Sequence, residues 1–473
     1  MHQTSSKSVP YYSTPLSCCQ SLLPEQVFSI WANDTWAFWL DSNQSEHVDC
    51  RYDIMVFNPT VTIKTQASST QVYWPDTGVK KVSTQDPLAL VKALLEQEFA
   101  QTEEDPEIPF CGGAVGYFSY DLGRHFERLP ATSVADITLP DMAVGIYRHA
   151  IVYDRTLKSY TLFSHDNNLD HLTAQIKQQL ETNQALIEQR ISNNPFALSS
   201  DWQANMSASQ YAEKFAQVQQ YLLSGDCYQI NLAQRFSAHY QGDEYSAYLT
   251  LREANKAPFS AFMRIEEGSI LSLSPERFLQ LKQQKVQTKP IKGTKPRSEN
   301  PKFDQEHAIA LQNSPKDRAE NLMIVDLLRN DISKVCRAGT VNVPSLFAIE
   351  SFPAVHHLVS TVEGMLAQPY DATDLLRGAF PGGSITGAPK IRAMEIIEEL
   401  EPHRRSVYCG SIGYISACGK MDTSITIRTL ICEHDRIHCW AGGGLVADSQ
   451  VDSEYQETFD KVNKILPILK QSV

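Results

Sequence analysis

Two pairs of acidic side chains in the last third of the chain have a spacing that suits a metal site. Asp317 and Glu320 belong to one predicted helix, and Glu454 and Glu457 belong to another. A separation of three residues places the members of each pair on the same side of a helix. If the two helices face each other, their carboxylates can hold a hard cation such as Mg²⁺, which takes one or two protein carboxylates together with water and substrate oxygens. Taken alone, such spacing is more often explained by surface acids paired with Arg or Lys.

Two cationic side chains also occupy positions where chemistry is possible. Lys292 lies in PIKGT (290–294), directly after a strand-like segment and before a glycine. A desolvated lysine amine can stay neutral and act as a nucleophile, although a lysine in such a loop is more commonly solvated. Arg428 alternates with apolar residues in TSITIRTL (423–430), which predicts a strand with an inward-facing arginine. That arginine needs an anion, which can be a substrate carboxylate or, more commonly, a structural salt-bridge partner.

Two glycine-rich segments allow the backbone to come close to a ligand. PGGSITGAPK (381–390) leads into a predicted helix, so its N–H groups are able to bind an anion, but its spacing matches neither a P-loop nor a dinucleotide fingerprint. AGGGL (441–445) follows a predicted strand and permits close backbone approach. Each segment is equally well explained as a turn. The tandem His356-His357 does not indicate zinc, because no second His or Cys stands at ligand spacing.

The elements that position these residues are a mixture of strands and helices. Alternating or apolar runs predict strands at 51–56, 60–64, 112–120, 148–153, 159–164, 410–416, 423–430 and 437–441. Helices are predicted after a capping box at Ser207–Gln210, with Gly225 as the stop, and at 317–335 and 454–466. The helix at 317–335 is apolar nearly all round, so we expect it to be buried, and Glu320 then needs a cation. Because strands and helices do not alternate regularly, the expected fold class is α+β.

Composition divides the chain into three parts. Residues 1–167 form an N-terminal region, residues 168–205 are rich in Gln, Asn and Ser and form the best candidate linker, and residues 206–469 contain the reactive candidates. The N-terminal third is free to interleave with the C-terminal region. In that case, a boundary along the sequence is not a boundary in space.

Charge and composition exclude several classes of function. The 473-residue chain has a net charge of −13 and a pI near 5.5, so it lacks the basic surface that nucleic acid requires. No apolar run is long enough to cross a membrane, and the N-terminus has no signal-peptide core. The ten cysteines are scattered without a metal-binding pattern, which indicates reduced thiols and a cytoplasmic location.

In their order along the chain, these motifs resemble those of the chorismate-utilising enzymes, a family that includes anthranilate, isochorismate, salicylate and aminodeoxychorismate synthases. The resemblance is dense over residues 206–466 and sparser in the N-terminal third. The matching blocks are FWLDS (38–42), GGAVGYFSYD (112–121), SPERF (274–278), PIKGT (290–294), DRAENLMIVDLLRND (317–331), HHLVSTVEG (356–364), FPGGSITGAPKIRAMEIIEELEP (380–402), CGSIGY (409–414), TSITIRT (423–429), AGGGLVADS (441–449) and EYQETFDKV (454–462). The resemblance implies an α+β fold like that of anthranilate synthase component I, with antiparallel sheets packed face to face and helices outside.

Within this family, the lysine of PIKGT resembles the nucleophile of the aminodeoxychorismate synthases, because anthranilate synthases typically carry alanine at that position. The resemblance implies that Lys292 attacks C2 of chorismate while the C4 hydroxyl leaves, and that Glu276 protonates the departing hydroxyl. Ammonia then adds at C4 and expels Lys292. The product, 4-amino-4-deoxychorismate, leads to 4-aminobenzoate and folate, so the resemblance implies a transferase.

The resemblance also implies the remaining members of the site. Glu320 and Glu457, with Glu454 adjacent, correspond to Mg²⁺ ligands, and the metal grips the ring carboxylate of chorismate. The positions that correspond to substrate-binding groups are His357, Thr386, Tyr414, Arg428, Gly442, Gly443, Gly444 and Lys461. A substrate with two carboxylates then accounts for both Arg428 and the metal.

The N-terminal region resembles the tryptophan pocket of the family. The matching residues are Ser42, Asp49, Cys50, Arg51, Tyr52, Pro258, Phe259 and Ser260. This pocket gives feedback control in anthranilate synthases. Here NKAPF (255–259) departs from the NPSPY that is typical of feedback-regulated members, so a bound tryptophan is expected to be structural.

The ammonia source and the alternative functions follow from the same resemblance. The sequence has no GxCxG nucleophile elbow, so ammonia is expected from a separate glutamine amidotransferase subunit in a heterodimer. One alternative is anthranilate synthase component I, against which Lys292 argues. Another is an isochorismate or salicylate synthase, in which a lysine base lies upstream of PIKGT. The last is a non-catalytic tryptophan-binding or scaffolding protein, against which the presence of Glu276, Lys292, Glu320 and Glu457 argues.

Overall fold

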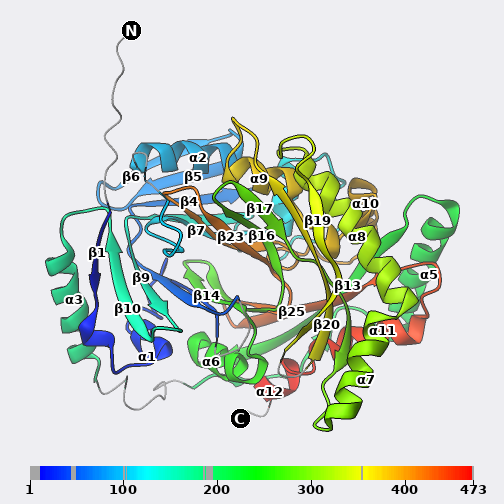
Figure 1. The fold of residues 1–473 in the computed structure, drawn as a ribbon. Helices are drawn as coiled ribbons and strands as arrows, with labels where there is room; N and C mark the ends of the chain where they lie inside the picture. The colour runs from blue at the N-terminus through cyan, green and yellow to red at the C-terminus, as the bar shows by residue number, and fades with distance from the viewer. Residues whose placement is uncertain are drawn as a thin grey trace.

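Two antiparallel sheets form the frame of the protein (Figure 1). The structure is a computed structural model and describes residues 11–43, 49–99, 102, 104–184, 187, 195–352 and 355–470. The first sheet has 13 strands, two of which, β12 (Gln203–Ala204) and β21 (Gly387–Ala388), pair only with β13. The others are, in spatial order, β1 (Tyr12–Pro15), β10 (Ser159–Ser164), β9 (His149–Asp154), β3 (Tyr52–Val56), β2 (Phe38–Asp41), β14 (Phe259–Ile265), β15 (Gly268–Ser274), β24 (Thr429–Glu433), β25 (Arg436–Leu445), β13 (Gln229–Gln241) and β11 (Ala197–Leu198).

The second sheet has 12 strands, and one of them, β19 (Asn342–Ser351), pairs only with β20. The others are, in spatial order, β18 (Ile291–Pro296), β20 (Val355–Met365), β17 (Lys285–Thr288), β16 (Arg277–Lys282), β23 (Met421–Ile425), β22 (Ser411–Ser416), β7 (Gly113–Phe118), β8 (Met142–Tyr147), β4 (Val61–Gln66), β5 (Ser69–Trp74) and β6 (Val79–Ser83).

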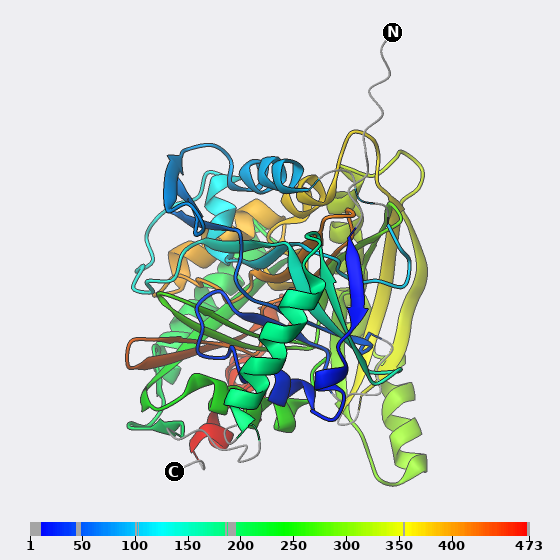
Figure 2. The ribbon, with the colours of Figure 1, turned by 90° about the vertical axis from the view of Figure 1, so that its left-hand side faces the viewer.

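Helices lie on the outside of this frame (Figure 1). They are α1 (Pro24–Phe28), α2 (Pro87–Glu98), α3 (Leu169–Thr182), α5 (Ala208–Ser224), α6 (Glu244–Asn255), α7 (Pro301–Gln312), α8 (Pro315–Ser333), α9 (Ala372–Ala379), α10 (Lys390–Leu400), α11 (Val451–Asp460) and α12 (Leu466–Lys470), with 3-10 turns η1 (Ser17–Cys19), η2 (Tyr120–His125) and η3 (Gly383–Ile385). Figure 2 shows α3 lying along β1 and β10 at one edge of the first sheet. Among the described residues, no helix is both long enough and apolar enough to cross a membrane.

The core follows from the two-residue periodicity of the strands. In β2, Phe38 belongs to the core that also contains Val144 of β8 and Leu279 of β16, two strands of the second sheet. The next residue, Trp39, faces the opposite side and packs against Phe28 of α1. The two sheets therefore face each other, and a second apolar layer lies under the helices on the far side of the first sheet. This arrangement confirms the expected α+β fold class.

Both sheets take strands from either side of the predicted linker. In the first sheet, Phe38 of β2 pairs with Met263 of β14, and in the second, Gly113 of β7 pairs with Ser416 of β22. The N-terminal third thus interleaves with the C-terminal region. The division into 1–167, 168–205 and 206–469 remains a prediction along the sequence, and residues 185, 186 and 188–194 of its linker lie outside the described residues.

Local sequence signals are confirmed where they involve neighbours in the chain. Ser207 caps α5, its Oγ accepts a hydrogen bond from Gln210 N, and Gln210 Oε1 accepts one from Ser207 N. The helix ends at Gly225, whose φ of 81° is left-handed and suits glycine. The predicted pair of strands at 148–153 and 159–164 is the hairpin of β9 and β10.

Several predicted elements differ in the structure. The strand predicted at 423–430 is two strands, because β23 belongs to the second sheet and β24 to the first. Likewise, the strands predicted at 51–56 and 60–64 are β3 and β4, but the chain changes sheet between them. The periodicity of a segment does not show which sheet it joins, so these crossings are invisible in the sequence.

Two predicted helices also need correction. The helix predicted at 454–466 ends at Asp460 as α11, and a separate α12 begins at Leu466. The helix predicted at 317–335 is α8, which is not buried all round: it buries Ile324 and Val325, whereas Leu322 is 46% exposed. The apolar residues of this helix therefore predicted more complete burial than the structure shows.

Candidate active site

Lys292 and Glu276 meet at one residue of the predicted glycine-rich segment. Lys292 lies on β18, at a register shift in its pairing with β20, and Glu276 lies in the short connection between β15 and β16. The Lys292 Nζ donates a hydrogen bond to Ser384 O at 3.1 Å, and Ser384 Oγ donates one to Glu276 Oε1 at 3.0 Å. A single residue, Ser384, thus bridges an amine and a carboxyl group.

Burial shifts the pKa values of these two groups in opposite directions. Glu276 is 5% exposed, and this burial raises the pKa of its carboxyl group, although Lys292 and the Ser384 hydrogen bond partly offset the rise. Burial lowers the pKa of Lys292, with Glu320 and Glu276 opposing the shift. A carboxyl group with a raised pKa and an amine with a lowered pKa are suited to act as an acid and a nucleophile.

Three glutamates from two helices lie beside this pair. A Cβ atom on Gly443 of β25 would lie 3.2 Å from Glu454 Oε2 and 3.3 Å from Glu457 Oε1, so both α11 carboxylates lie against this strand. Burial raises the pKa of Glu320 on α8, and Lys292 opposes the rise whereas Glu454 adds to it. The two helices therefore bring like charges close together, although the spacing alone did not show that these helices face each other.

The surrounding charges show that these carboxylates suit a cation. Burial raises the pKa of Glu454, and the neighbouring Glu457 raises it further. Burial acts in the same direction on Glu457, but Lys461, at 2.7 Å from its Oε1, holds the pKa of that carboxyl group below its ordinary value. Lys316 on α8, which the sequence analysis did not identify, also lowers the pKa of Glu320 and Glu454.

These carboxylates fit a Mg²⁺ site in which water and substrate oxygens complete the coordination shell. Within the described part of the chain, no three His, Cys, Asp or Glu side chains gather closely enough to hold a metal by themselves. Mg²⁺ commonly binds one or two protein carboxylates and takes its remaining ligands from water and substrate. Glu320, Glu454 and Glu457 would supply the protein oxygens of such a site.

The glycines at 442–444 lie within β25, and not after a strand as predicted. They pair with Ala233, Leu232 and Asn231 of β13. Side chains occupy the space above them, since a Cβ on Gly444 would come within 1.8 Å of Gln229 Nε2. The Gly442 carbonyl accepts a hydrogen bond from Lys461 Nζ at 2.7 Å, which places Lys461 at the site.

Arg428 lies at a crossing between sheets rather than on a strand. It follows β23 and precedes β24, and its φ of 51° is left-handed. Burial lowers the pKa of its guanidinium, and Glu276 opposes that shift. The carboxylates described in the structure form no ion pair with it. The structure therefore has the predicted inward-facing arginine near Glu276. It lies in the segment where the chain crosses from one sheet to the other, and not within a strand.

His357 and Thr386 flank the Lys292–Ser384 contact. His357 Nδ1 lies 2.9 Å from Thr294 Oγ1, two residues along from Lys292. The hydroxyl of the buried Thr386 donates to Gly382 O at 3.1 Å, so it holds the turn that presents Ser384. His357 thus contacts the side chain of a residue on the strand that carries Lys292, and Thr386 holds the turn that carries Ser384.

Two buried amides that the sequence analysis did not single out also lie here. Gln229 and Asn231 alternate on β13, and their side-chain oxygens find no hydrogen-bond partner within the described residues. Asn231 N donates to Thr386 O at 2.8 Å, which joins this strand to the turn with Ser384. The signal in the sequence is the pair of polar residues at alternate positions in QINL, at the start of β13.

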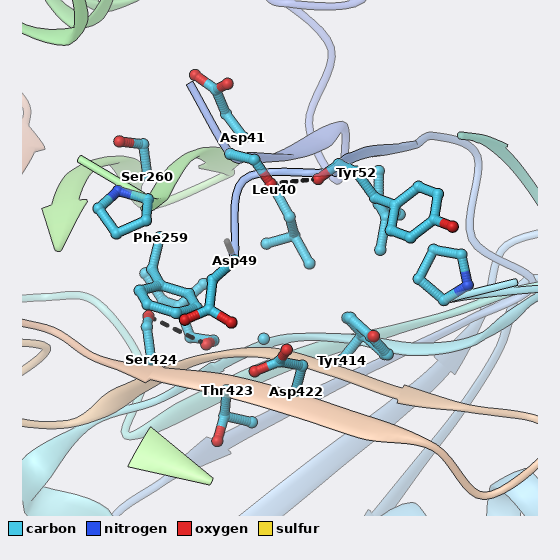
Figure 3. A pocket seen from close by; sticks show the side chains of 16 residues that line it. Leu40, Asp41, Asp49, Tyr52, Phe259, Ser260, Tyr414, Asp422, Thr423 and Ser424 are labelled. Carbon is cyan, nitrogen blue, oxygen red and sulfur yellow. Dashed lines mark hydrogen bonds between the residues drawn. The ribbon is translucent and has the colours of Figure 1, made fainter. Parts of the chain in front are cut away.

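A separate cavity of about 110 Å³ is lined by residues from both sheets (Figure 3). The predicted tryptophan-pocket residues that line it are Ser42, Asp49, Tyr52, Pro258, Phe259 and Ser260. Cys50 and Arg51 are not among its lining residues, and Arg51 is paired with Glu107 and Asp154, each at 3.0 Å.

Tyr414 lines this cavity and not the site around Lys292, which corrects its predicted placement (Figure 3). It lies on β22, where its neighbour Gly413 also lines the cavity. The cavity and the active site are nevertheless close along the chain. Arg277, the residue after Glu276, contacts two cavity carboxylates, Asp49 at 2.8 Å and Asp422 at 2.9 Å.

The chain is similar to several known proteins. The sequence profile described as "chorismate binding enzyme" matches residues 35–467. Aminodeoxychorismate synthase component 1 of Escherichia coli K12 is 54% identical over 94% of this chain and 96% of that protein. Anthranilate synthase component 1 of Thermus thermophilus is 37% identical over 83% of this chain and 84% of that protein.

Solved structures show the same fold. The crystal structure of anthranilate synthase component I from Streptococcus pneumoniae TIGR4 matches with a TM-score of 0.75 and 32% identity, over 89% of this chain and 93% of that one. The profile match covers most of the chain, and the similarity extends through both sheets. The chain therefore belongs to the family of chorismate binding enzymes.

Proposed function

We propose that this chain is the chorismate-aminating subunit of an aminodeoxychorismate synthase. The observation that carries the proposal is a half-buried lysine, Lys292, joined to a buried carboxyl group, Glu276, through Ser384. Their opposite pKa shifts favour a neutral amine and a protonated acid. The 54% identity to aminodeoxychorismate synthase component 1 of E. coli supports the same assignment.

In the proposed first half-reaction, the Lys292 amine forms a bond to C2 of chorismate. Both ring double bonds shift, from C1=C2 and C5=C6 to C1=C6 and C4=C5, the C4–O bond breaks, and Glu276 gives its proton to the leaving oxygen, which departs as water. The new C2 ammonium then returns one proton to the Glu276 carboxylate. In the second half-reaction, ammonia bonds to C4, both double bonds shift back, and the C2–N bond breaks. Proton transfer through Glu276 restores the neutral Lys292 amine, and the balance is chorismate plus ammonia to 4-amino-4-deoxychorismate plus water.

The remaining charged groups are proposed to orient the two substrate carboxylates. Arg428 and the backbone of β25 at Gly443 would hold one of them. Mg²⁺, bound by Glu320 and Glu457 with Glu454 adjacent, would neutralise these acids and anchor the ring carboxylate. Lys461 keeps Glu457 ionised and therefore ready to ligate the metal.

We further propose a glutamine amidotransferase as the partner that supplies ammonia, since the designation "component 1" of the bacterial relatives implies another component. The cavity lined by Ser42, Phe259 and Tyr414 is the proposed tryptophan site, because both aromatic rings and carboxylates line it. No disulfide joins the ten cysteines, all of which lie in the part of the chain that the structure describes, so they suit a reducing compartment and we propose the cytoplasm.

The test uses the purified chain with chorismate, Mg²⁺ and ammonium, and the products are separated by chromatography. We expect 4-amino-4-deoxychorismate from the wild type and at least about a hundredfold less from Lys292→Ala, because the covalent route is lost. Lys302→Ala on the exposed α7 is the matched control and should leave the rate unchanged.

The same experiment separates the alternatives. Anthranilate as the product would assign the chain to the function of its Thermus relative and refute the proposed role of Lys292. No turnover, even with a glutaminase partner present, would favour a tryptophan-binding or scaffolding protein.

A further inference from the structure

Two thiols outside the proposed active site, those of Cys111 and Cys418, lie side by side at one end of the second sheet. The pairing of β7 with β22 sets Gly113 opposite Ser416, and Ala417 N donates to Gly112 O at 2.7 Å. Continuing this register by two residues sets Cys111 opposite Cys418. The Cα atoms of directly opposed residues in an antiparallel pair are about 4.5–5.5 Å apart, a separation that a disulfide can span.

Side-chain contacts place the two sulfurs together. Ser416 Oγ lies 3.5 Å from Cys111 Sγ and 3.4 Å from Cys418 Sγ. The interaction between the two neighbouring thiols is the largest cause that lowers the pKa of Cys418 and raises the pKa of Cys111, and the buried Lys420 adds to the effect on Cys418.

The two cysteines differ in access to solvent. Cys418 is half-buried and lies in the turn that closes with a hydrogen bond from Gly419 N to Ser416 O, at 2.8 Å. Cys111 is only 2% exposed. A reagent in solution therefore reaches Cys418 first, and Cys111 is positioned behind it as a second thiol. A half-buried thiol with a lowered pKa, next to a second thiol that can resolve it, is the arrangement found at reactive cysteine pairs.

We propose that Cys418 and Cys111 form a reversible modification site for low-molecular-weight disulfides such as oxidised glutathione. The Cys418 thiolate attacks one sulfur of the reagent, forms a mixed disulfide and releases one reagent thiolate, which takes up a proton. Cys111 then loses its proton and attacks Cys418 Sγ, and the second reagent thiolate leaves and is protonated. Two protein thiols are oxidised to one disulfide, and one reagent disulfide is reduced to two thiols.

The site borders the cavity that we propose binds tryptophan. Phe110 packs edge-on against Tyr414, with ring centroids 5.4 Å apart, and Pro109 lines the same cavity. A Cys111–Cys418 disulfide would tie the segment with Pro109 and Phe110 to the turn after β22. Oxidation would thus fix one wall of the cavity.

The test treats the reduced full-length chain with oxidised glutathione and follows intact mass and tryptic peptides. We expect a loss of about 2 Da and a peptide pair joined through Cys111 and Cys418, both reversed by dithiothreitol. Cys111→Ser should stop at the first step and gain about 305 Da, one glutathione attached at Cys418. Cys418→Ser should abolish both products, and Cys336→Ser, at a buried cysteine elsewhere, should change neither.

Two results would overturn the inference. One is a wild-type chain that retains glutathione on Cys418 without ever joining Cys111. The other is a Cys418 that reacts no faster than Cys336 in the folded chain, although both react fully after unfolding in guanidinium. Modification of the adjacent Cys18 and Cys19 is distinguished from these outcomes, because both cysteines lie on a different tryptic peptide.

Discussion

At the scale of single residues, Ser384 is the group that links the amine and the acid. Its carbonyl accepts from Lys292 and its hydroxyl donates to Glu276, so one backbone position sets the distance between them. The turn that holds it is tied by Thr386 to Gly382 O and by Arg405 to Ile385 O. The placement of Ser384 therefore depends on the surrounding turn, and its hydroxyl is the part that a substitution can isolate.

Ser384→Ala removes the hydroxyl and leaves the carbonyl in place. We expect kcat/KM for ammonia-dependent turnover to fall about tenfold, equivalent to about 1.4 kcal/mol, because Glu276 loses a hydrogen bond that orients it. Ser384→Thr keeps a hydroxyl and should recover most of the rate. Equal losses in the two variants would instead indicate a packing effect.

The pH dependence of Lys292 reactivity is a second prediction at this scale. Only the neutral amine reacts with an acylating reagent, so labelling should rise with pH through the pKa of Lys292, which burial lowers below that of an ordinary lysine. Labelling of Lys292 should therefore reach half its maximum at a lower pH in the folded chain than in the chain unfolded by guanidinium. Glu276 raises the pKa of Lys292, so Glu276→Gln should move the folded-chain midpoint to still lower pH. Equal Lys292 midpoints in the folded and unfolded chain would contradict the burial argument. Mass spectrometry of the labelled peptides measures both midpoints.

At the scale of elements, the helices around the site are joined by buried polar contacts as well as by packing. Lys390, the first residue of α10, contacts Asp331 of α8 at 2.6 Å and Ala379 O at 2.7 Å. Asp331 is 1% exposed and also contacts Lys334 at 3.1 Å. Since α8 carries Glu320 and α10 follows the turn with Ser384, this contact fixes two parts of the site relative to each other.

Lys390→Met should destabilise the protein by about 3 kcal/mol, because the buried Asp331 would lose the lysine that it contacts at 2.6 Å. Lys334→Met removes the other lysine, which is half-exposed, and should cost less than about 1 kcal/mol. Denaturant unfolding followed by tryptophan fluorescence measures both. Similar losses in the two variants would show that burial does not distinguish these ion pairs.

At the scale of the whole molecule, the interleaved sheets make the two halves of the sequence depend on each other. β2 lies between β3 and β14, and β7 lies between β22 and β8, so strands from the N-terminal third are internal to both sheets. Removing them would leave unpaired strand edges and expose the core that contains Phe38 and Val144.

We therefore expect one cooperative unfolding transition for the full chain, despite its length. Fragment 206–473, which the predicted linker would define as a domain, should fail to give a sharp transition of its own. Calorimetry of the full chain and the fragment tests this. Two resolved transitions, or a cooperatively folded fragment, would mean that the predicted boundary is also a boundary in space.

The sequence by itself determined those features that depend on residues close together in the chain. The capping box at Ser207 and the stop at Gly225 bounded α5, because a helix end is satisfied by its own neighbours. The three-residue spacing of Glu454 and Glu457 placed both on one side of α11 for the same reason. The ordered motifs also indicated the family and, through it, the α+β fold.

Only the tertiary structure decided which residues meet across the two sheets. The periodicity around Arg428 and Tyr414 predicted strands correctly in part, but it could not show that the chain changes sheet at Arg428 or that Tyr414 faces the other cavity. Nor could it identify Ser384, whose importance lies in contacts to residues about one hundred positions away. Long-range pairing depends on how both sheets close over a shared core, and local periodicity carries no record of that choice.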